Sequence, residues 1–188
     1  MTEQEKIRRE KLEELKKLGI NPYPAELFPV NSFSSKLIED FEDEQEVIIA
    51  GRIMSRRIQG NASFAEIQDS KGRIQIYFNR DEICKTEDKT KYNVVYKKLL
   101  DIGDIVGIKG SMFKTKVGEV TVLVKDFTLL NKSLRPLPLP KVDSEGNDND
   151  SFTDLEKRYR QRHVDLNVNY HGNAHLINRT KLYKTIRG

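Results

Sequence analysis

Residues 62–79 are ASFAEIQDSKGRIQIYFN, two short runs of alternating apolar and polar residues on either side of a Ser-Lys-Gly turn. Side chains alternate between the two faces of a β-strand, so each run predicts one buried and one outward face. The residues predicted to face the core are Ala65, Ile67, Ile74, Ile76 and Phe78. The stretch therefore predicts a β-hairpin with one packed face.

Strand-like alternation continues on both sides of this hairpin. The predicted strands are 46–57, 62–69, 73–79, 104–115 and 119–130, with a short helix at 93–100 and a Val-Gly turn at 117–118. Five strands with a helix between the third and the fourth is the order of the OB-fold, a small Greek-key barrel that binds oligonucleotides. The predicted fold class is mainly β with flanking helices, and the barrel occupies residues 46–131.

Residues 1–45 precede the barrel as a predicted helix followed by a Pro-containing arm. The helix is predicted over 3–18, and its apolar stripe consists of Ile7, Leu12, Leu15 and Leu18. The prolines of INPYPAELFP at 20–29 exclude helix and favour an extended crossing of a neighbouring surface. The helix is either a solvated arm, which its composition favours, or a binding element.

Residues 132–153 contain RPLPLPK at 135–141 and continue as a polar run, which predicts a linker. Helix-forming composition returns at 154–188, and the chain stops inside that pattern. We therefore expect this segment to be the truncated start of another domain.

Composition limits the class of protein. A chain of 188 residues with 37% apolar content has room for one ordinary domain with extensions. No run approaches the roughly 20 apolar residues of a membrane-spanning helix, and the charged N-terminus lacks the apolar core of a signal peptide. The single cysteine, Cys84, cannot form an internal disulfide, so we expect a cytoplasmic protein. Residues 46–131 contain 15 Lys or Arg and 11 Asp or Glu, an excess of positive charge that could bind a polyanion.

The outward face of the two hairpin strands is the candidate functional surface. Its predicted members are Phe64, Glu66, Gln68, Arg73, Gln75 and Tyr77. An aromatic residue beside amides and charges on these strands is typical of OB-folds that bind single-stranded nucleic acid. Alternatively, Phe64 closes the barrel and packs under the N-terminal arm.

Basic residues near this face are further candidates. Arg56 and Arg57 end the first strand and could contact a phosphate or a base edge, or they could be a solvated pair. Lys114 and Lys116 flank a hairpin tip, where they could meet a passing strand or only aid solubility.

No catalytic or metal site is predicted. His171 and His175 have the i,i+4 spacing of two metal ligands on one helical face, but a third ligand is not evident. The chain contains no Gly-rich phosphate loop and no Ser/His/Asp set.

Five segments in order resemble the class II lysyl-tRNA synthetases. They are EKLEELKKLGINPYP at 10–24, RIMSRRIQGNASFAEIQDSKGRIQIY at 52–77, GDIVGIKGSMFKTKVGEVTV at 103–122, KSLRPLPLPK at 132–141 and EKRYRQRHVDL at 156–166. The resemblance implies the N-terminal anticodon-binding region and the start of the catalytic domain. It further implies tRNA(Lys) as partner, ATP and Mg²⁺ as cofactors of the complete, dimeric enzyme, and no catalysis by residues 1–188 alone.

The resemblance also assigns residue roles. The anticodon-reading residues of the family fall on Arg57, Phe64, Gln75 and Glu119, with Phe64 stacked on a uridine. Arg56, Arg73, Tyr77, Lys114 and Lys116 remain additional candidates from the residue patterns alone.

Some positions depart from the family pattern. Asn61 stands where the family usually has Lys, His163 and Val164 replace the usual Tyr-Leu, and 142–153 is a lengthened linker. The alternatives are the anticodon domain of an aspartyl- or asparaginyl-tRNA synthetase and a free-standing OB-fold module that binds nucleic acid.

Overall fold

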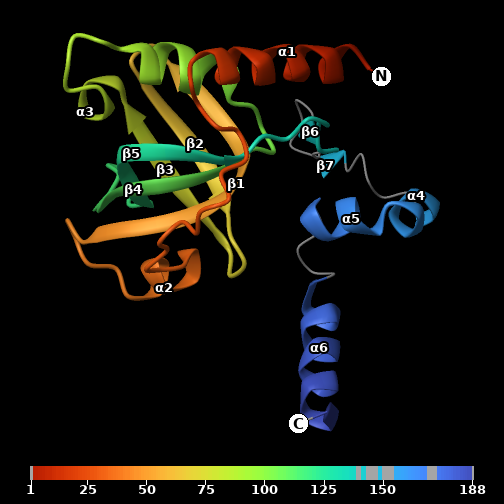
Figure 1. The fold of residues 1–188 in the computed structure, drawn as a ribbon. Helices are drawn as coiled ribbons and strands as arrows, with labels where there is room; N and C mark the ends of the chain where they lie inside the picture. Colours follow the sequence, from red (N-terminus) through yellow and green to blue (C-terminus); the bar gives the residue numbers. More distant parts are fainter. Residues whose placement is uncertain (1, 139–140, 143–147, 150–154, 169–172, 188) are drawn as a thin grey trace. The chain divides into compact units, whose positions relative to one another are not determined.

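The computed structural model describes residues 2–138, 141–142, 148–149, 155–168 and 173–187. It divides into two compact units, Met1–Pro136 and Leu137–Gly188. The first unit contains the barrel, its N-terminal helix and the arm between them (Figure 1). The predicted regions 1–45 and 46–131 thus lie together in the first unit.

Five strands form the barrel (Figure 1). They are β1 (Glu46–Gln59), β2 (Ala62–Gln68), β3 (Arg73–Asn79), β4 (Ile105–Lys114) and β5 (Val120–Asn131). The closed order is β1-β2-β3-β5-β4, in which β3 and β5 run parallel and the other pairs are antiparallel. The five predicted strands are confirmed, and so is the predicted fold class.

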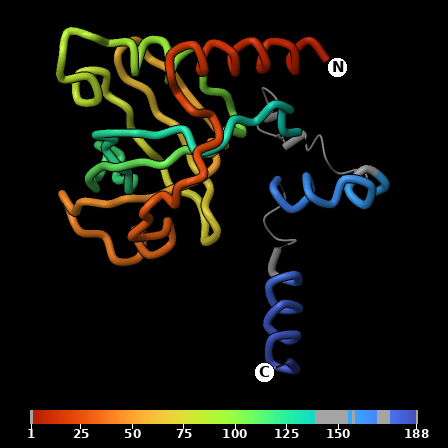
Figure 2. The backbone as a smooth tube through the Cα atoms, viewed as in Figure 1, coloured from red at the N-terminus to blue at the C-terminus, as the bar shows by residue number. Residues whose placement is uncertain are grey.

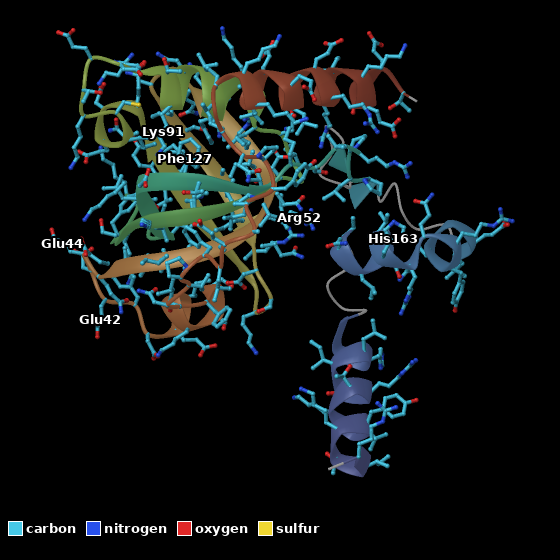
Figure 3. The ribbon with its side chains drawn as sticks, viewed as in Figure 1. Glu42, Glu44, Arg52, Lys91, Phe127 and His163 are labelled. Atoms are coloured by element: carbon cyan, nitrogen blue, oxygen red, sulfur yellow. The ribbon has the colours of Figure 1, made fainter. Side chains whose placement is uncertain are left out.

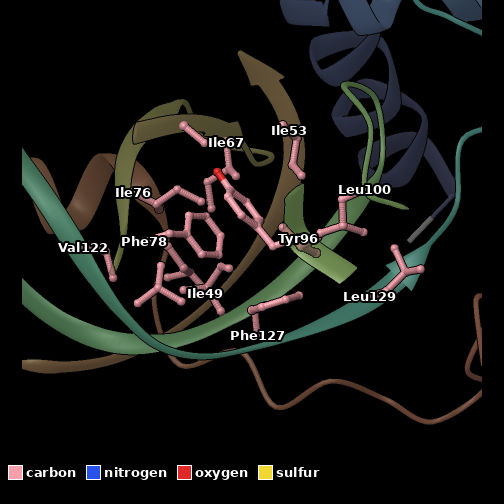
Figure 4. Packing of buried hydrophobic residues seen from close by; sticks show 14 of the residues in the cluster. Ile49, Ile53, Ile67, Ile76, Phe78, Tyr96, Leu100, Val122, Phe127 and Leu129 are labelled. Atoms are coloured by element: carbon pink, nitrogen blue, oxygen red, sulfur yellow. The ribbon is translucent and has the colours of Figure 1, made fainter. Parts of the chain in front are cut away.

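The core lies inside this barrel (Figure 4). All five residues that alternation assigned to the core are buried: Ala65, Ile67, Ile74, Ile76 and Phe78. Phe78 stacks on Tyr96 with ring centroids 3.9 Å apart, and Phe127 meets the Phe78 ring edge-on at 5.6 Å. Stacked and edge-on pairs are the favoured geometries of aromatic rings, so this group is a stabilising centre of the core.

The helix η1 (Lys91–Leu99), between β3 and β4, lies within two residues of the predicted helix and has π-type hydrogen bonding. The short α3 (Arg80–Ile83) precedes it. The buried Tyr96 hydroxyl of η1 is 2.7 Å from Ser63 Oγ on β2. At the start of η1, Lys91 pairs with Asp126 and lies over the Phe127 ring at 5.2 Å (Figure 3). The helix is therefore held to the barrel at both its core face and its edge.

The N-terminal helix α1 (Glu3–Lys17) begins with a capping box, in which Thr2 and Glu5 satisfy each other's backbone N–H groups. Leu12 and Leu15 of the predicted stripe are buried, but Ile7 and Leu18 are 44% and 46% exposed. Only the middle of the predicted apolar stripe is therefore buried, and α1 contacts η1.

Arg8 is buried on this face of α1, where its guanidinium donates to the backbone oxygens of Ile102 at 2.9 Å and Ser133 at 3.0 Å. Arginine can cover an apolar contact with its stem while its head group satisfies carbonyls. The favoured interpretation of α1 as a solvated arm is corrected: the helix packs on the barrel unit.

The arm after α1 follows the barrel surface as its prolines predict. Its backbone joins β1 where Asn31 N–H donates to the Ile48 oxygen at 2.9 Å. Phe28 lies against Gly107 of β4, where a Cβ would be 2.5 Å from the ring, so this position admits only glycine without a shift. The short α2 (Ser34–Glu39) then attaches to the β2–β3 turn through Ser34 and Asp69.

In the part of the second unit that the structure describes there are two short strands and three helices, whose backbone Figure 2 traces. They are β6 (Lys141–Val142), β7 (Asp148–Asn149), α4 (Leu155–Arg160), α5 (Arg162–Val168) and α6 (Asn173–Arg187). Buried Asp165 on α5 accepts from Arg158 at 2.8 Å and Arg162 at 2.7 Å, while His163 is exposed (Figure 3). The other residues of the predicted lengthened linker 142–153 lie outside the described residues, as does His171. No helix among the described residues is long and apolar enough to cross a membrane.

Candidate nucleic-acid interface

A cavity of about 500 Å³ opens on the outer face of the barrel. It is bounded by the end of β1, the outward side chains of β2 and β3, and the hairpin between β4 and β5. Its lining residues are Ser55, Arg56, Arg57, Phe64, Ala65, Glu66, Gln75, Thr115, Val117 and Glu119. The four residues to which the resemblance assigned the anticodon-reading role, Arg57, Phe64, Gln75 and Glu119, all lie in this group.

Strand register explains how distant residues meet in this cavity. One row of outward positions runs from Arg57 on β1 to Phe64 on β2 and Tyr77 on β3. The next row contains Ser55, Glu66, Gln75 and Thr121, one from each of β1, β2, β3 and β5. Because neighbouring strands lie only about 4.8 Å apart, the members of a row are side by side.

The first row carries an aromatic surface. The Phe64 and Tyr77 rings are 4.8 Å apart, and Phe113 of β4 meets Tyr77 edge-on at 5.9 Å. Phe64 is half-buried and lines the cavity, which favours its interpretation as a stacking platform over the alternative of packing under the arm. A ring fixed by its neighbours can stack a base without losing side-chain freedom.

The second row is ordered by hydrogen bonds. Thr121 Oγ1 donates to Gln75 Oε1 at 2.8 Å, and Gln75 Nε2 donates to Glu119 Oε2 at 2.7 Å. The hydroxyl therefore fixes which end of the Gln75 amide faces the carboxylate. Glu119 itself is held by the hairpin, since its backbone N–H donates to Thr115 Oγ1 at 3.1 Å. The cavity thus presents a preorganised amide donor beside a carboxylate acceptor.

Arg56 lines the cavity but its guanidinium is engaged elsewhere. Nη1 donates to the backbone oxygens of Tyr96 at 2.6 Å and Leu100 at 2.9 Å, and the group lies 5.5 Å from the centre of the Tyr96 ring. These carbonyls belong to the C-terminal end of η1, which has no further turn to satisfy them. The contacts support a structural role for Arg56 in place of the suggested RNA contact.

The other additional candidates lie around the cavity, and none of them is among its lining residues. Arg73 donates to Gln68 at 2.9 Å and pairs with Glu66 at 3.4 Å. Lys114 lies over the Phe41 ring at 4.5 Å, and Lys116 is exposed at the hairpin tip. Tyr77 supports the Phe64 ring from the side.

Sequence patterns did not identify Ser55, Thr115, Val117 and Thr121 as members of the site. Val117 and Thr115 enter it through the hairpin, whose turn ends at Gly118 with φ of 85°. The Val-Gly turn was a usable signal, because it brings this tip over the strand face; the pairing of Thr121 with Gln75 has no local signal.

Comparison with known proteins matches residues 47–130 to the OB-fold nucleic acid binding domain of tRNA anticodon-binding proteins. Residues 47–130 belong to that family. Along its whole length the chain is 64% identical to the lysine–tRNA ligase of Christiangramia forsetii and 50% identical to that of Porphyromonas gingivalis. The lysine–tRNA ligase of Azobacteroides pseudotrichonymphae is also 50% identical.

The chain spans about a third of the length of these relatives, 33% of the first two and 38% of the third. The family match covers the barrel and so includes every residue that lines the cavity. The matched residues therefore contain the whole candidate interface, and the predicted resemblance to the lysyl-tRNA synthetases is confirmed.

Proposed function

We propose that this chain binds the anticodon loop of tRNA(Lys) and reads a uridine in the cavity formed by Arg57, Phe64, Gln75 and Glu119. The carrying observation is the hydrogen-bonded Thr121–Gln75–Glu119 row beside the Phe64 ring. A stacking surface next to a fixed donor and a fixed acceptor suits an unpaired base, which is held by its face and read at its edge.

Uridine matches these groups atom by atom. Its base edge presents an N3–H donor between two carbonyl oxygens, so the Glu119 carboxylate can accept from N3 while an N–H of Gln75 or Arg57 meets a carbonyl. Cytidine carries a lone pair at N3, which a carboxylate repels. Phosphates are expected to lie toward Arg57, since the cavity itself contains two carboxylates, Glu66 and Glu119.

Base substitution tests the proposal directly. Replacing the recognised anticodon uridine by cytidine in a stem-loop should weaken binding by roughly 1–3 kcal/mol, the usual scale of a lost base-edge contact. Glu119→Gln should narrow this uridine preference more than it lowers total affinity, because its amide can donate to cytidine N3. An unchanged uridine-to-cytidine ratio in Glu119→Gln, measured by fluorescence anisotropy, would remove Glu119 from the reading role.

Removal of the platform should act differently. Phe64→Ala should cost about 1–3 kcal/mol for uridine and cytidine alike, because stacking does not depend on the base edge. Phe33→Ala is the matched control, since Phe33 is 43% exposed on the arm and lies outside the cavity. Equal losses from the two substitutions would contradict the assignment of Phe64.

For the complete protein we propose lysine–tRNA ligase activity, in which lysine is activated with ATP and Mg²⁺ and transferred to tRNA(Lys), in a cytoplasmic homodimer. The names of the relatives support this activity. The described residues contain no group of three or more His, Cys, Asp or Glu that could hold a metal ion. Residues 1–188 are expected to form no lysyl-adenylate by themselves.

A further inference from the structure

Glu66 stands in the middle of the interface without a role in the proposed uridine site. It occupies the outward face of β2, where its register partners are Ser55 on β1 and Gln75 on β3. Its side chain lines the same cavity as Phe64 and Glu119. The cavity therefore has a carboxylate on either side of the Gln75 amide.

The hydrogen bonds of Gln75 distinguish Glu119 from Glu66. Its amide nitrogen donates to Glu119 and its amide oxygen accepts from Thr121, so the ordered row runs away from β2. Glu66 instead pairs with Arg73 at 3.4 Å, and the two side chains are 37% and 41% exposed. Exposed ion pairs of this kind contribute little to stability, so a ligand can replace Arg73 as the partner of Glu66 at small cost.

The hydrogen-bond donors that an RNA base offers indicate what Glu66 can bind. An ionised carboxylate only accepts hydrogen bonds, and it repels phosphate. A uridine base offers one N–H donor, which the proposed function gives to Glu119. A second carboxylate in the cavity therefore needs a donor from another nucleotide.

We propose that Glu66 is a second specificity-determining residue, which accepts a hydrogen bond from a base N–H of the nucleotide next to the one stacked on Phe64. This inference rests on the proposed function. It extends the recognised unit from one base to two consecutive unpaired bases, the second of which must carry an imino or amino donor toward β2.

A double-mutant cycle tests the contact. The probe is an RNA stem-loop with three consecutive unpaired uridines, each replaced in turn by N3-methyluridine, which lacks the N3–H, or by 2′-deoxyuridine, which lacks the ribose hydroxyl. Coupling of the N3-methyl penalty to Glu119→Gln identifies the base that the proposed uridine site holds against Phe64. At a uridine next to it, N3-methylation should weaken binding to the wild type by roughly five- to a hundredfold, and Glu66→Ala should reduce that penalty to less than about twofold.

Two variants control the cycle. Glu42→Ala removes an exposed carboxylate between α2 and β1 (Figure 3), outside the cavity, and should keep the full penalty. Glu66→Gln preserves the side-chain shape and an acceptor oxygen, and should leave an intermediate penalty because a neutral acceptor bonds more weakly.

The outcomes separate the two proposals. If the wild type binds the stem-loop normally but Glu66→Ala leaves the N3-methyl penalty unchanged at every uridine, the proposed role of Glu66 is wrong. The proposed uridine site would then still stand. A coupling confined to 2′-deoxyuridine overturns the role of Glu66 as well, since the donor would then be a sugar hydroxyl. Wild-type binding no tighter to the stem-loop than to a duplex of equal length overturns the proposed function and this inference together.

Discussion

Lys132 is the most buried cation of the barrel unit, with a side chain that is 0% exposed. Its ammonium donates to the Leu99 oxygen at 2.8 Å, to Asp101 at 2.6 Å and to Asp104 at 2.8 Å. Burial raises the pKa of Asp104, and it acts in the same direction on Asp101, but hydrogen bonds from Lys11 and Lys132 hold the pKa of Asp101 below its ordinary value. The cluster fixes the backbone where the chain leaves β5.

Lys132→Met should lower the free energy of unfolding by about 3–5 kcal/mol, because it leaves the buried Asp104 carboxylate without its cation. Lys125→Met is the matched control: Lys125 pairs with Glu46 at 3.1 Å on the surface, and its loss should cost less than about 1 kcal/mol. Urea unfolding of both variants provides the measurement. Similar losses would show that the Lys132 cluster adds nothing beyond a surface pair.

Tyr96 makes the stability of the barrel depend on pH in the alkaline range. Burial raises the pKa of its hydroxyl to about 12, although the Ser63 hydrogen bond and Arg56 act in the opposite direction. The unfolded group titrates near 10, so its contribution is present below about pH 10 and is lost as the pH rises toward 12. The wild type should therefore lose stability more steeply than Tyr96→Phe over that interval, by roughly 2–3 kcal/mol in total. Parallel unfolding curves for the two proteins at pH 9 to 12 would refute this.

At the scale of elements, α1 is an integral part of the barrel unit. Leu15 of α1 is 0% exposed, while Ile7 on the same helix is 44% exposed. Leu15→Ala should destabilise the barrel by about 2–5 kcal/mol, the usual cost of such a truncation in a core, and Ile7→Ala by much less. Thermal unfolding followed through barrel signals, such as tyrosine absorbance, tests the difference. If Leu15→Ala frays α1 and leaves the barrel transition in place, the helix is only an attached arm.

At the scale of the whole molecule, every residue that lines the cavity belongs to the unit Met1–Pro136. A chain ending at Pro136 should therefore bind an anticodon stem-loop within about twofold of the chain of 188 residues. Both chains should lose affinity with rising salt. The logarithm of the association constant should fall against the logarithm of the salt concentration with a slope of about −0.7 for each phosphate contact on a single strand. Much weaker binding by the shorter chain would mean that residues beyond Pro136 hold the RNA. A flat response of the affinity to salt would contradict an electrostatic grip on the phosphates.

The sequence by itself determined the strands and the direction of their side chains. Alternation is a local property, and it correctly separated Ile74, Ile76 and Phe78 inside the barrel from Gln75 and Tyr77 outside it. It also indicated an outward Phe64. The resemblance, carried by segments spread along the chain, then selected Arg57, Gln75 and Glu119.

Tertiary structure decided the partners of these side chains. Thr121 meets Gln75 only because β5 pairs in parallel with β3, a register set by barrel closure across more than 40 residues of chain. Arg56 and Arg57 are neighbours in the sequence, yet Arg56 turns to the carbonyls of η1 while Arg57 stays exposed. Periodicity specifies which face a residue takes, but hydrogen-bond partners depend on which distant backbone groups the closed barrel leaves unsatisfied.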